Sequence, residues 1–242
     1  MEENAGGSTG TGMERDSWNR VESDIESIGE FYDSAASIIS FGMMDRWRKK
    51  AALETADGMD VLEVGSGPGS FSRHLKGRVV MLEPNEAMLR KSLKGGLSEG
   101  RYVPVIGVAE HLPFVDGAFD RVMSGFSFKN FMDKGKALLD IHRVLRQDGR
   151  VVIIDIAEPD SGIRRRVMAF YMKHLLGRLA ILAVPRSRRK EWKSNPWHHL
   201  SLAYMNLGRP DALAERMKRM GYSSSAYRYL MTHGVAIVTG EK

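Results

Sequence analysis

The sequence contains no cysteine in 242 residues, which excludes disulfide bonds and zinc sites built on thiolates. This composition fits a protein of the reducing cytosol. No cluster of other metal-binding side chains stands out, so we expect no metal site. Residues 1–12 are rich in Gly, Ser and Thr and hold no apolar core. We therefore expect a disordered tail there and not a secretory signal.

Internal repeats are also absent, and one continuous α/β pattern runs through the chain. This predicts a single domain over residues 13–242. The formal net charge of +6 is unevenly distributed. Residues 164–193 hold ten Lys or Arg and one acid, a segment charge of +9, so the remainder carries −3. Such a block favours an anionic partner, either a membrane surface or a nucleic acid.

The most informative stretch is Asp60-Val-Leu-Glu-Val-Gly-Ser-Gly-Pro-Gly69. Its apolar run predicts a buried parallel strand over 60–64. Gly65, Gly67 and Gly69 follow, and glycines permit a sharp turn and the close approach of a ligand. Apolar spacing from Ser70 onward predicts a helix. Together these features indicate a nucleotide-binding turn.

Two acids indicate which nucleotide binds. The spacing G-x-G-x-G differs from the dinucleotide pattern G-x-G-x-x-G, which disfavours a dehydrogenase. Glu63 precedes the first glycine, and a carboxylate there suits the methionyl ammonium of S-adenosylmethionine better than a pyrophosphate. Glu83 follows a predicted strand at 78–82 and can accept both ribose hydroxyls. A tight turn without a ligand is the simpler alternative.

Further apolar runs predict strands over 102–106, 119–124, 151–156, 225–231 and 235–239. Helical spacing predicts helices over 86–93, 134–147, 164–184 and 210–220. The expected fold is therefore an α/β, Rossmann-like doubly wound sheet of about seven strands, mostly parallel with an antiparallel last strand. N-terminal helices over 14–56 and a helical lid insertion at about 161–209 complete it. The 164–184 helix either lies on a membrane face or covers a pocket.

Ligands of such sheets bind beyond the carboxyl ends of the strands. Ala109 leaves room for an adenine ring, and Glu110 accepts a hydrogen bond from its amino group, unless Glu110 is simply an exposed loop acid. We expect His142 and His233 to be structural. The predicted cofactor-binding residues are Glu63, Gly65, Ser66, Gly67, Gly69, Glu83, Pro84, Met88, Ala109, Glu110, Gly125 and Phe126.

Several longer stretches resemble the ubiquinone/menaquinone-biosynthesis C-methyltransferases over residues 31–238. They are Phe31-Tyr32-Asp33, 41–47, 109–114, 126–130, 136–145 and the closing run 222–238. The resemblance implies C-methylation of a quinone precursor, with S-adenosylmethionine as cofactor and S-adenosylhomocysteine as product. The chain departs from the family pattern in having Glu for Asp at 63 and 83, Pro68 for Thr or Ser, Val108 for Asn and Lys129 for Arg.

Methylation of a hydroquinone carbon requires a neighbouring hydroxyl to lose its proton. The resemblance implies Tyr32 as the base and Lys129 as the group that orients or polarises the acceptor. His198 and His199 are further candidates for the base, on the chemistry of the imidazole side chain alone. Two alternatives stay open: an O- or N-methyltransferase of another small molecule or lipid, and a nucleic-acid-binding protein that uses residues 164–193. The long apolar stretches within that block argue against the second alternative.

The expected partner is a small-molecule or lipid-like methyl acceptor. Peripheral association with an anionic membrane and a homodimer also stay open. The expected location is the cytoplasm or the inner face of its membrane.

Overall fold

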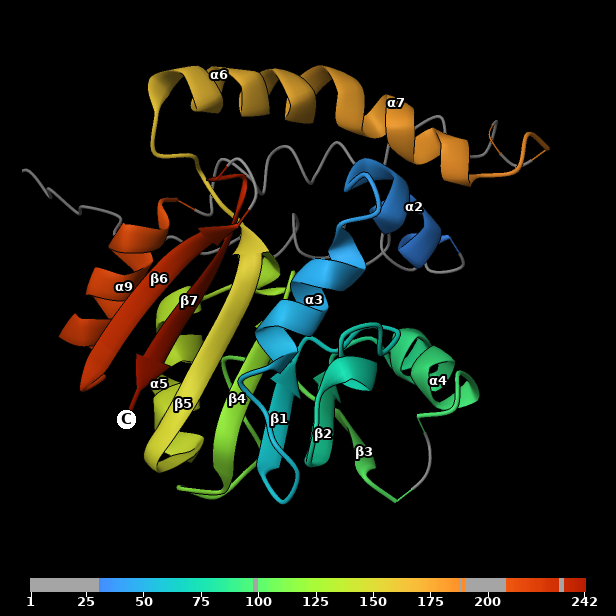
Figure 1. The fold of residues 1–242 in the computed structure, drawn as a ribbon. Helices are drawn as coiled ribbons and strands as arrows, with labels where there is room; N and C mark the ends of the chain where they lie inside the picture. Colours follow the sequence, from blue (N-terminus) through green and yellow to red (C-terminus); the bar gives the residue numbers. More distant parts are fainter. Residues whose placement is uncertain (1–30, 98–99, 188, 190–207, 231–232) are drawn as a thin grey trace, which may run out of the picture.

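The computed structural model describes residues 31–97, 100–187, 189, 208–230 and 233–242. Its centre is a seven-stranded sheet in the order β3-β2-β1-β4-β5-β7-β6 (Figure 1). The strands are β1 (Asp60–Val64), β2 (Arg78–Glu83), β3 (Tyr102–Ile106), β4 (Phe119–Gly125), β5 (Leu145–Ile156), β6 (Ser224–Leu230) and β7 (Val235–Glu241). Strands β1 to β5 pair in parallel, whereas β7 is antiparallel to both β5 and β6. The predicted Rossmann-like sheet is confirmed.

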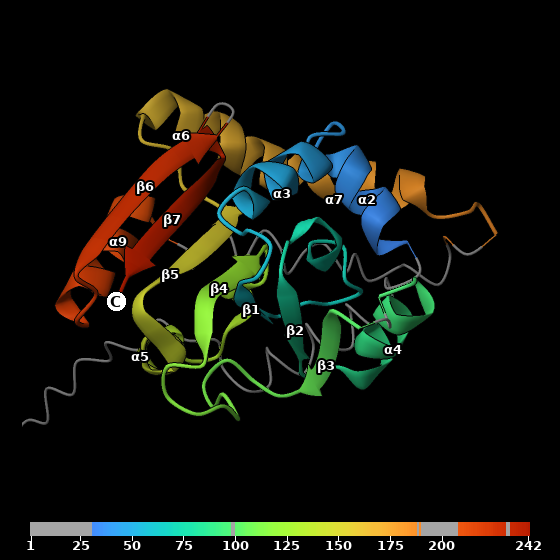
Figure 2. The same cartoon turned by 60° about the horizontal axis from the view of Figure 1, so that its bottom comes forward.

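Successive side chains of the central strands point to opposite faces of the sheet and form two cores, one on each face. Leu62 of β1 packs in one core with Leu138 of α5 (Lys134–Val144) and Met217 of α9 (Pro210–Arg219). Its neighbour Val61 packs in the other with Ala51 of α3 (Met44–Ala52). Figure 2 shows α3 and α5 on opposite sides of the sheet, as the doubly wound prediction requires.

Two of the predicted helices are shorter in the structure. The residues after the glycine loop form only a short 3₁₀ turn, Ser72–His74, because Leu75 is already extended and the chain must reach β2 at Arg78. Helix α5 ends at Val144, three residues before the predicted end, because Leu145 pairs with Phe119 in the sheet. Helix α4 (Glu86–Lys94) follows its prediction closely.

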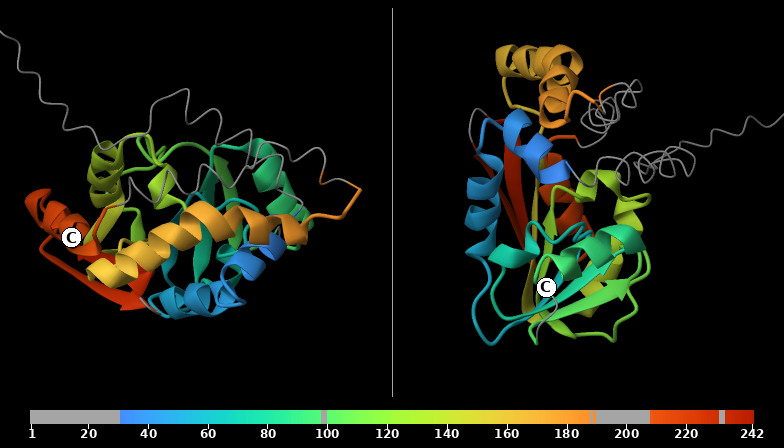
Figure 3. Two further views of the ribbon diagram at one scale, coloured as in Figure 1. Left: turned by 90° about the horizontal axis from the view of Figure 1, so that it is seen from above. Right: turned by 90° about the vertical axis from the view of Figure 1, so that its right-hand side faces the viewer.

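The predicted helix over 164–184 is divided into several segments. Helix α6 (Gly162–Phe170) has no buried residue, a π-helical turn follows at Tyr171–Leu175, and α7 (Leu176–Ala180) leads into a 3₁₀ turn at Ile181–Ala183. The Tyr171 hydroxyl donates to the Ile39 carbonyl of α2 (Tyr32–Ile39). These segments lie across the carboxyl edge of the sheet, above α2 and α3 (Figure 3).

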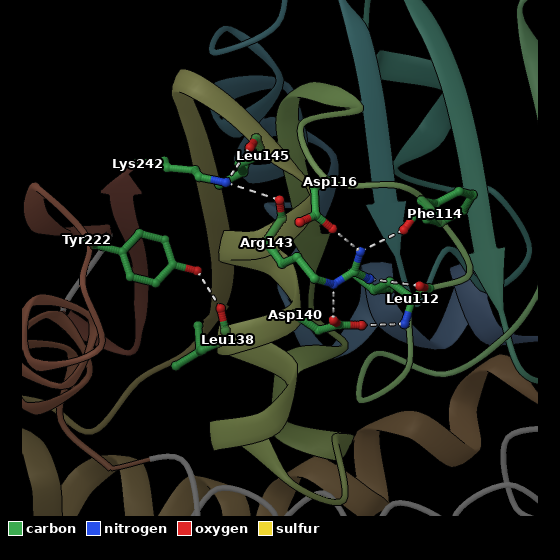
Figure 4. A network of polar contacts seen from close by, with 9 residues as sticks. All are labelled: Leu112, Phe114, Asp116, Leu138, Asp140, Arg143, Leu145, Tyr222 and Lys242. Atoms are coloured by element: carbon green, nitrogen blue, oxygen red, sulfur yellow. Dashed lines mark hydrogen bonds and ion pairs between the residues drawn. The ribbon is translucent and has the colours of Figure 1, made fainter.

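A polar network fastens the loop after β3 to α5 (Figure 4). The Arg143 guanidinium donates to the carbonyls of Leu112 and Phe114 and to the carboxylates of Asp116 and Asp140. Asp140 in turn accepts the Leu112 N–H at 2.6 Å. These contacts fix the loop that carries Ala109 and Glu110.

In the part of the chain that the structure describes, no helix is long and apolar enough to cross a membrane. The predicted disordered tail at 1–12 lies outside the described residues, as does most of the 190–209 part of the predicted insertion.

Candidate active site

A pocket lies at the carboxyl ends of β1, β2 and β4, where the strand order reverses between β1 and β4. Ligands of open α/β sheets bind at such switch points. We call it the glycine-loop pocket. Of the twelve predicted cofactor-binding residues, eleven line it: Glu63, Gly65, Ser66, Gly67, Glu83, Pro84, Met88, Ala109, Glu110, Gly125 and Phe126.

Gly69 is the exception and does not line this pocket. Its φ is +79°, and a Cβ there would lie 2.2 Å from Cδ1 of Leu97. The glycine is required by packing and backbone conformation. Gly65 has a similar constraint, since its φ is +74° and a Cβ would lie 2.5 Å from that of Ser127. Gly67 has open space where a Cβ would stand, so a ligand can approach its backbone closely.

Glu63 is almost completely buried at the floor of the glycine-loop pocket. The Ser72 hydroxyl donates to its Oε2, while Oε1 has no hydrogen-bond partner among the described residues. Burial raises the pKa of Glu63 to about 8, against the opposing effects of Ser72 and the nearby Arg48 charge. An incoming cation would stabilise the carboxylate and satisfy the unpaired oxygen.

Glu83 lies at the tip of β2 and holds the glycine loop. Its Oε2 accepts the Gly67 N–H at 2.8 Å, and its Oε1 accepts the Asn85 N–H at 3.2 Å. The Asn85 side chain caps α4 by accepting the Met88 N–H, which positions Met88 in the pocket wall.

The opposite wall carries Ala109, which is buried, and Glu110. Glu110 Oε1 accepts the Asp133 N–H at 3.0 Å just before α5 begins. The carboxylate is therefore anchored by the backbone and is more than an exposed loop acid.

A second and largely apolar cavity of about 420 Å³ adjoins the glycine-loop pocket. We call it the apolar cavity. Phe126 lines both spaces and adopts a φ of +60°. The remaining walls come from α2, α3, α6, the π-helical turn and the start of β7, through residues including Ile39, Trp47, Met168, Met172 and Val235.

Lys129 is a charged residue in the wall of the apolar cavity, with 4% of its side chain exposed. Its Nζ lies 3.2 Å from Oδ1 of Asp155 and donates to the Phe126 carbonyl. Asp155 also accepts the Lys129 N–H and the Ile156 N–H. The ammonium is therefore fixed in place beside the residue that separates the two spaces.

Of the other predicted catalytic residues, the structure describes only the position of Tyr32. Tyr32 is the first residue of α2, a helix that contributes to the apolar cavity. His198 and His199 lie outside the described residues. His142 donates a hydrogen bond from Nε2 to the Gly221 carbonyl and contacts Tyr222, and His233 pairs with Asp160, as expected of structural histidines.

Sequence reasoning missed Arg48, which lines the glycine-loop pocket from α3. Its position one turn from Met44 and Ala52, on the face that carries Ala51, was visible in the sequence. A buried arginine on an otherwise apolar helix face is a signal of a partner.

Comparison with known proteins places this geometry in a family. A family model described as the ubiE/COQ5 methyltransferase family matches residues 13–242. A demethylmenaquinone methyltransferase from Thermus thermophilus is 32% identical over 226 residues, covering 88% of this chain and 97% of the relative. One from Deinococcus radiodurans is 30% identical over 234 residues, covering 93% of both chains.

A solved structure from Thermotoga maritima, described as an S-adenosylmethionine-dependent methyltransferase and possible histamine N-methyltransferase, superposes with a TM-score of 0.62. It is 18% identical, and the match covers 91% of this chain and 99% of that one. At this identity the likeness establishes the shared fold.

Proposed function

Because this chain belongs to the ubiE/COQ5 methyltransferase family and is an S-adenosylmethionine-dependent methyltransferase, we propose that it methylates a ring carbon of a polyprenyl hydroquinone. The acceptor would be of the demethylmenaquinol type, since relatives that match most of the chain are named for demethylmenaquinone.

We assign the cofactor to the glycine-loop pocket. Glu63 would hold the methionyl ammonium, Glu83 the ribose hydroxyls, and Ala109 with Glu110 the adenine. The unpaired, buried Oε1 of Glu63 supports this fit, because it requires a donor that the described residues do not supply. Bound there, S-adenosylmethionine supplies an electrophilic methyl group.

The assignment of the methyl acceptor rests on the apolar cavity. Its lining is mostly hydrophobic, and it meets the glycine-loop pocket at Phe126. An apolar ring with a prenyl chain would bury its surface there at a gain of about 25 cal/mol per Å². A small polar amine would lose solvation without compensating contacts.

Within this arrangement the chain supplies alignment, water exclusion and charge. The fixed ammonium of Lys129 would stabilise the negative charge that develops on a hydroquinone oxygen once its proton leaves. Tyr32 is our first candidate to accept that proton, and His198 and His199 are the next.

Quinone profiling tests the acceptor class in cells. A strain lacking this protein should accumulate a demethylated quinone, and the intact gene should restore the methylated form. An unchanged quinone profile with a change in a methylated amine or ether lipid would favour the O- or N-methyltransferase alternative.

We further infer that α6 docks the enzyme on a lipid surface. Ile163, Val167 and Phe170 recur at helical spacing and are 77%, 63% and 58% exposed. Ile163 and Val167 also line the apolar cavity, so the exposed stripe continues into the space assigned to the acceptor. A prenyl chain could thus pass from a bilayer into the cavity without crossing water.

Electrostatics would assist this docking to a limited degree. Arg164 already pairs with Asp160 at 3.1 Å and Arg165 with Glu158 at 2.7 Å. We therefore expect binding to anionic liposomes that weakens with salt but retains an apolar component. Flotation of the intact protein and of Val167→Glu, compared with the exposed Leu53→Glu on the far end of α3, measures it. Equal flotation of both variants and the intact protein would contradict docking through α6.

A further inference from the structure

Arg48 is a buried cation whose charge is not fully used within the described structure. It lies in the middle of α3, and its side chain is 9% exposed. Its Nη1 lies 3.4 Å from Oδ1 of Asp33, a distance at which the hydrogen bond is weak. Its Nε is buried and has no hydrogen-bond partner among the described residues. An unsatisfied guanidinium N–H inside a pocket is costly, which indicates a missing acceptor.

The wall of the same pocket carries an unsatisfied atom of the opposite kind. Glu63 Oε1 is buried and unpartnered, and Glu63 feels the Arg48 charge electrostatically. Across the described residues, however, no ion pair within 4 Å joins these two side chains. The glycine-loop pocket therefore presents a separated donor and acceptor, matched to a ligand that carries both charges.

We propose that Arg48 binds the carboxylate of the methionyl end of S-adenosylmethionine while Glu63 binds its ammonium. This inference rests on the cofactor assignment made above and adds a residue to it. A guanidinium suits the role because it remains charged when buried and offers several donors to one carboxylate.

The position of Arg48 also connects the cofactor to the helices of the apolar cavity. Asp33 of α2 accepts hydrogen bonds from Arg48 of α3 and, at 2.5 Å, from the hydroxyl of Ser70 beside the glycine loop. One carboxylate thus joins α2, α3 and the loop. A cofactor carboxylate on Arg48 would complete this contact set.

A cycle of ligand and protein changes isolates the contact. The probes are S-adenosylmethionine and decarboxylated S-adenosylmethionine, which lacks the carboxylate and keeps the ammonium, sulfonium and adenosine. Isothermal titration is performed on the intact protein, on Arg48→Met, and on Arg46→Met, an exposed arginine of the same helix.

The intact protein and Arg46→Met should prefer the full cofactor by about 10- to 100-fold, the range expected for a charge-assisted contact. Arg48→Met should lose this preference and bind the decarboxylated probe with little change. A loss of affinity for both probes alike would make Arg48 merely structural and overturn the proposal. So would equal binding of the two probes by the intact protein, a result that does not depend on whether the variant folds.

The cofactor assignment itself is tested separately by Glu83→Ala. If that variant binds S-adenosylmethionine normally, the glycine-loop pocket is wrongly assigned. If Glu83→Ala weakens binding while Arg48→Met leaves the carboxylate preference intact, only the role of Arg48 is wrong.

Discussion

Glu83 Oε2 accepts the Gly67 N–H at 2.8 Å, so the acid at the tip of β2 and the glycine loop after β1 form one unit. The sequence features that first indicated a nucleotide site are thus physically coupled. The carboxylate that we assign to the ribose also fixes the loop that faces the methionyl end.

Glu83→Ala should weaken S-adenosylmethionine binding by about tenfold or more. The substitution removes the acceptor for the ribose hydroxyls and leaves the Gly67 and Asn85 N–H groups without their partner, at a cost of about 1–3 kcal/mol. Titration calorimetry measures the loss. Glu86→Ala, which removes an exposed acid from the first turn of α4, serves as the matched control and should bind normally.

Glu63→Gln should change how stability depends on pH. Burial raises the pKa of Glu63 to about 8 from 4.5, so between these values the folded protein holds a proton that the unfolded chain has lost. Stability of the ligand-free protein therefore falls as pH rises through this window, by up to about 1.4 kcal/mol per pH unit.

Because glutamine stays neutral, the ligand-free Glu63→Gln variant should match the intact protein near pH 4.5 and melt at a higher temperature at pH 9. Its affinity for S-adenosylmethionine should nevertheless fall. Melting curves from pH 4.5 to 9 measure the first effect, with Glu215→Gln at an exposed position of α9 as control. A constant difference in melting temperature at every pH would show that Glu63 does not titrate in this window.

Lys129→Met should lower turnover by about 100-fold while S-adenosylmethionine affinity stays within about twofold. The ammonium lies in the wall of the apolar cavity, so its loss removes transition-state stabilisation and not cofactor contacts. Asp155 keeps two backbone donors, which limits the loss of stability. Lys129→Arg should recover part of the rate, and Lys136→Met on the exposed face of α5 should have no effect. Full activity of Lys129→Met would remove Lys129 from the chemistry.

Tyr32→Phe should lower turnover and leave cofactor affinity unchanged, because we assign Tyr32 to the acceptor and not to the cofactor. Single-turnover methylation together with calorimetry separates the two effects. Tyr227→Phe, an exposed tyrosine of β6, is the control. If Tyr32→Phe turns over normally, the proton acceptor must be sought elsewhere, first at His198 and His199.

Much of this fold could be predicted because local and global signals agree. The strands at Asp60–Val64 and Tyr102–Ile106 have the predicted bounds, because each is a short apolar run between polar turns, although β1 is buried and β3 is a largely exposed edge strand. The glycine loop and its two acids were predictable because they form a short local motif.

Other features depend on contacts between residues that are distant in the sequence, which local patterns do not reveal. The 3₁₀ turn at Ser72–His74 replaces a predicted helix because β2 begins so soon afterwards. The packing of Gly69 against Leu97 is a tertiary contact, which the local glycine pattern does not reveal. The sequence shows Arg48 on the apolar face of α3, but only the fold shows that its unpaired Nε is buried at the pocket that holds Glu63.

The fate of a labelled methyl group tests most directly whether the enzyme methylates a ring carbon. The purified enzyme is incubated with S-adenosylmethionine carrying a deuterated methyl and a short-chain demethylmenaquinol, and the product is analysed by mass spectrometry and carbon NMR. We expect one deuterated methyl bonded to a ring carbon. A label on oxygen, or no product from an enzyme that binds S-adenosylhomocysteine, would contradict it.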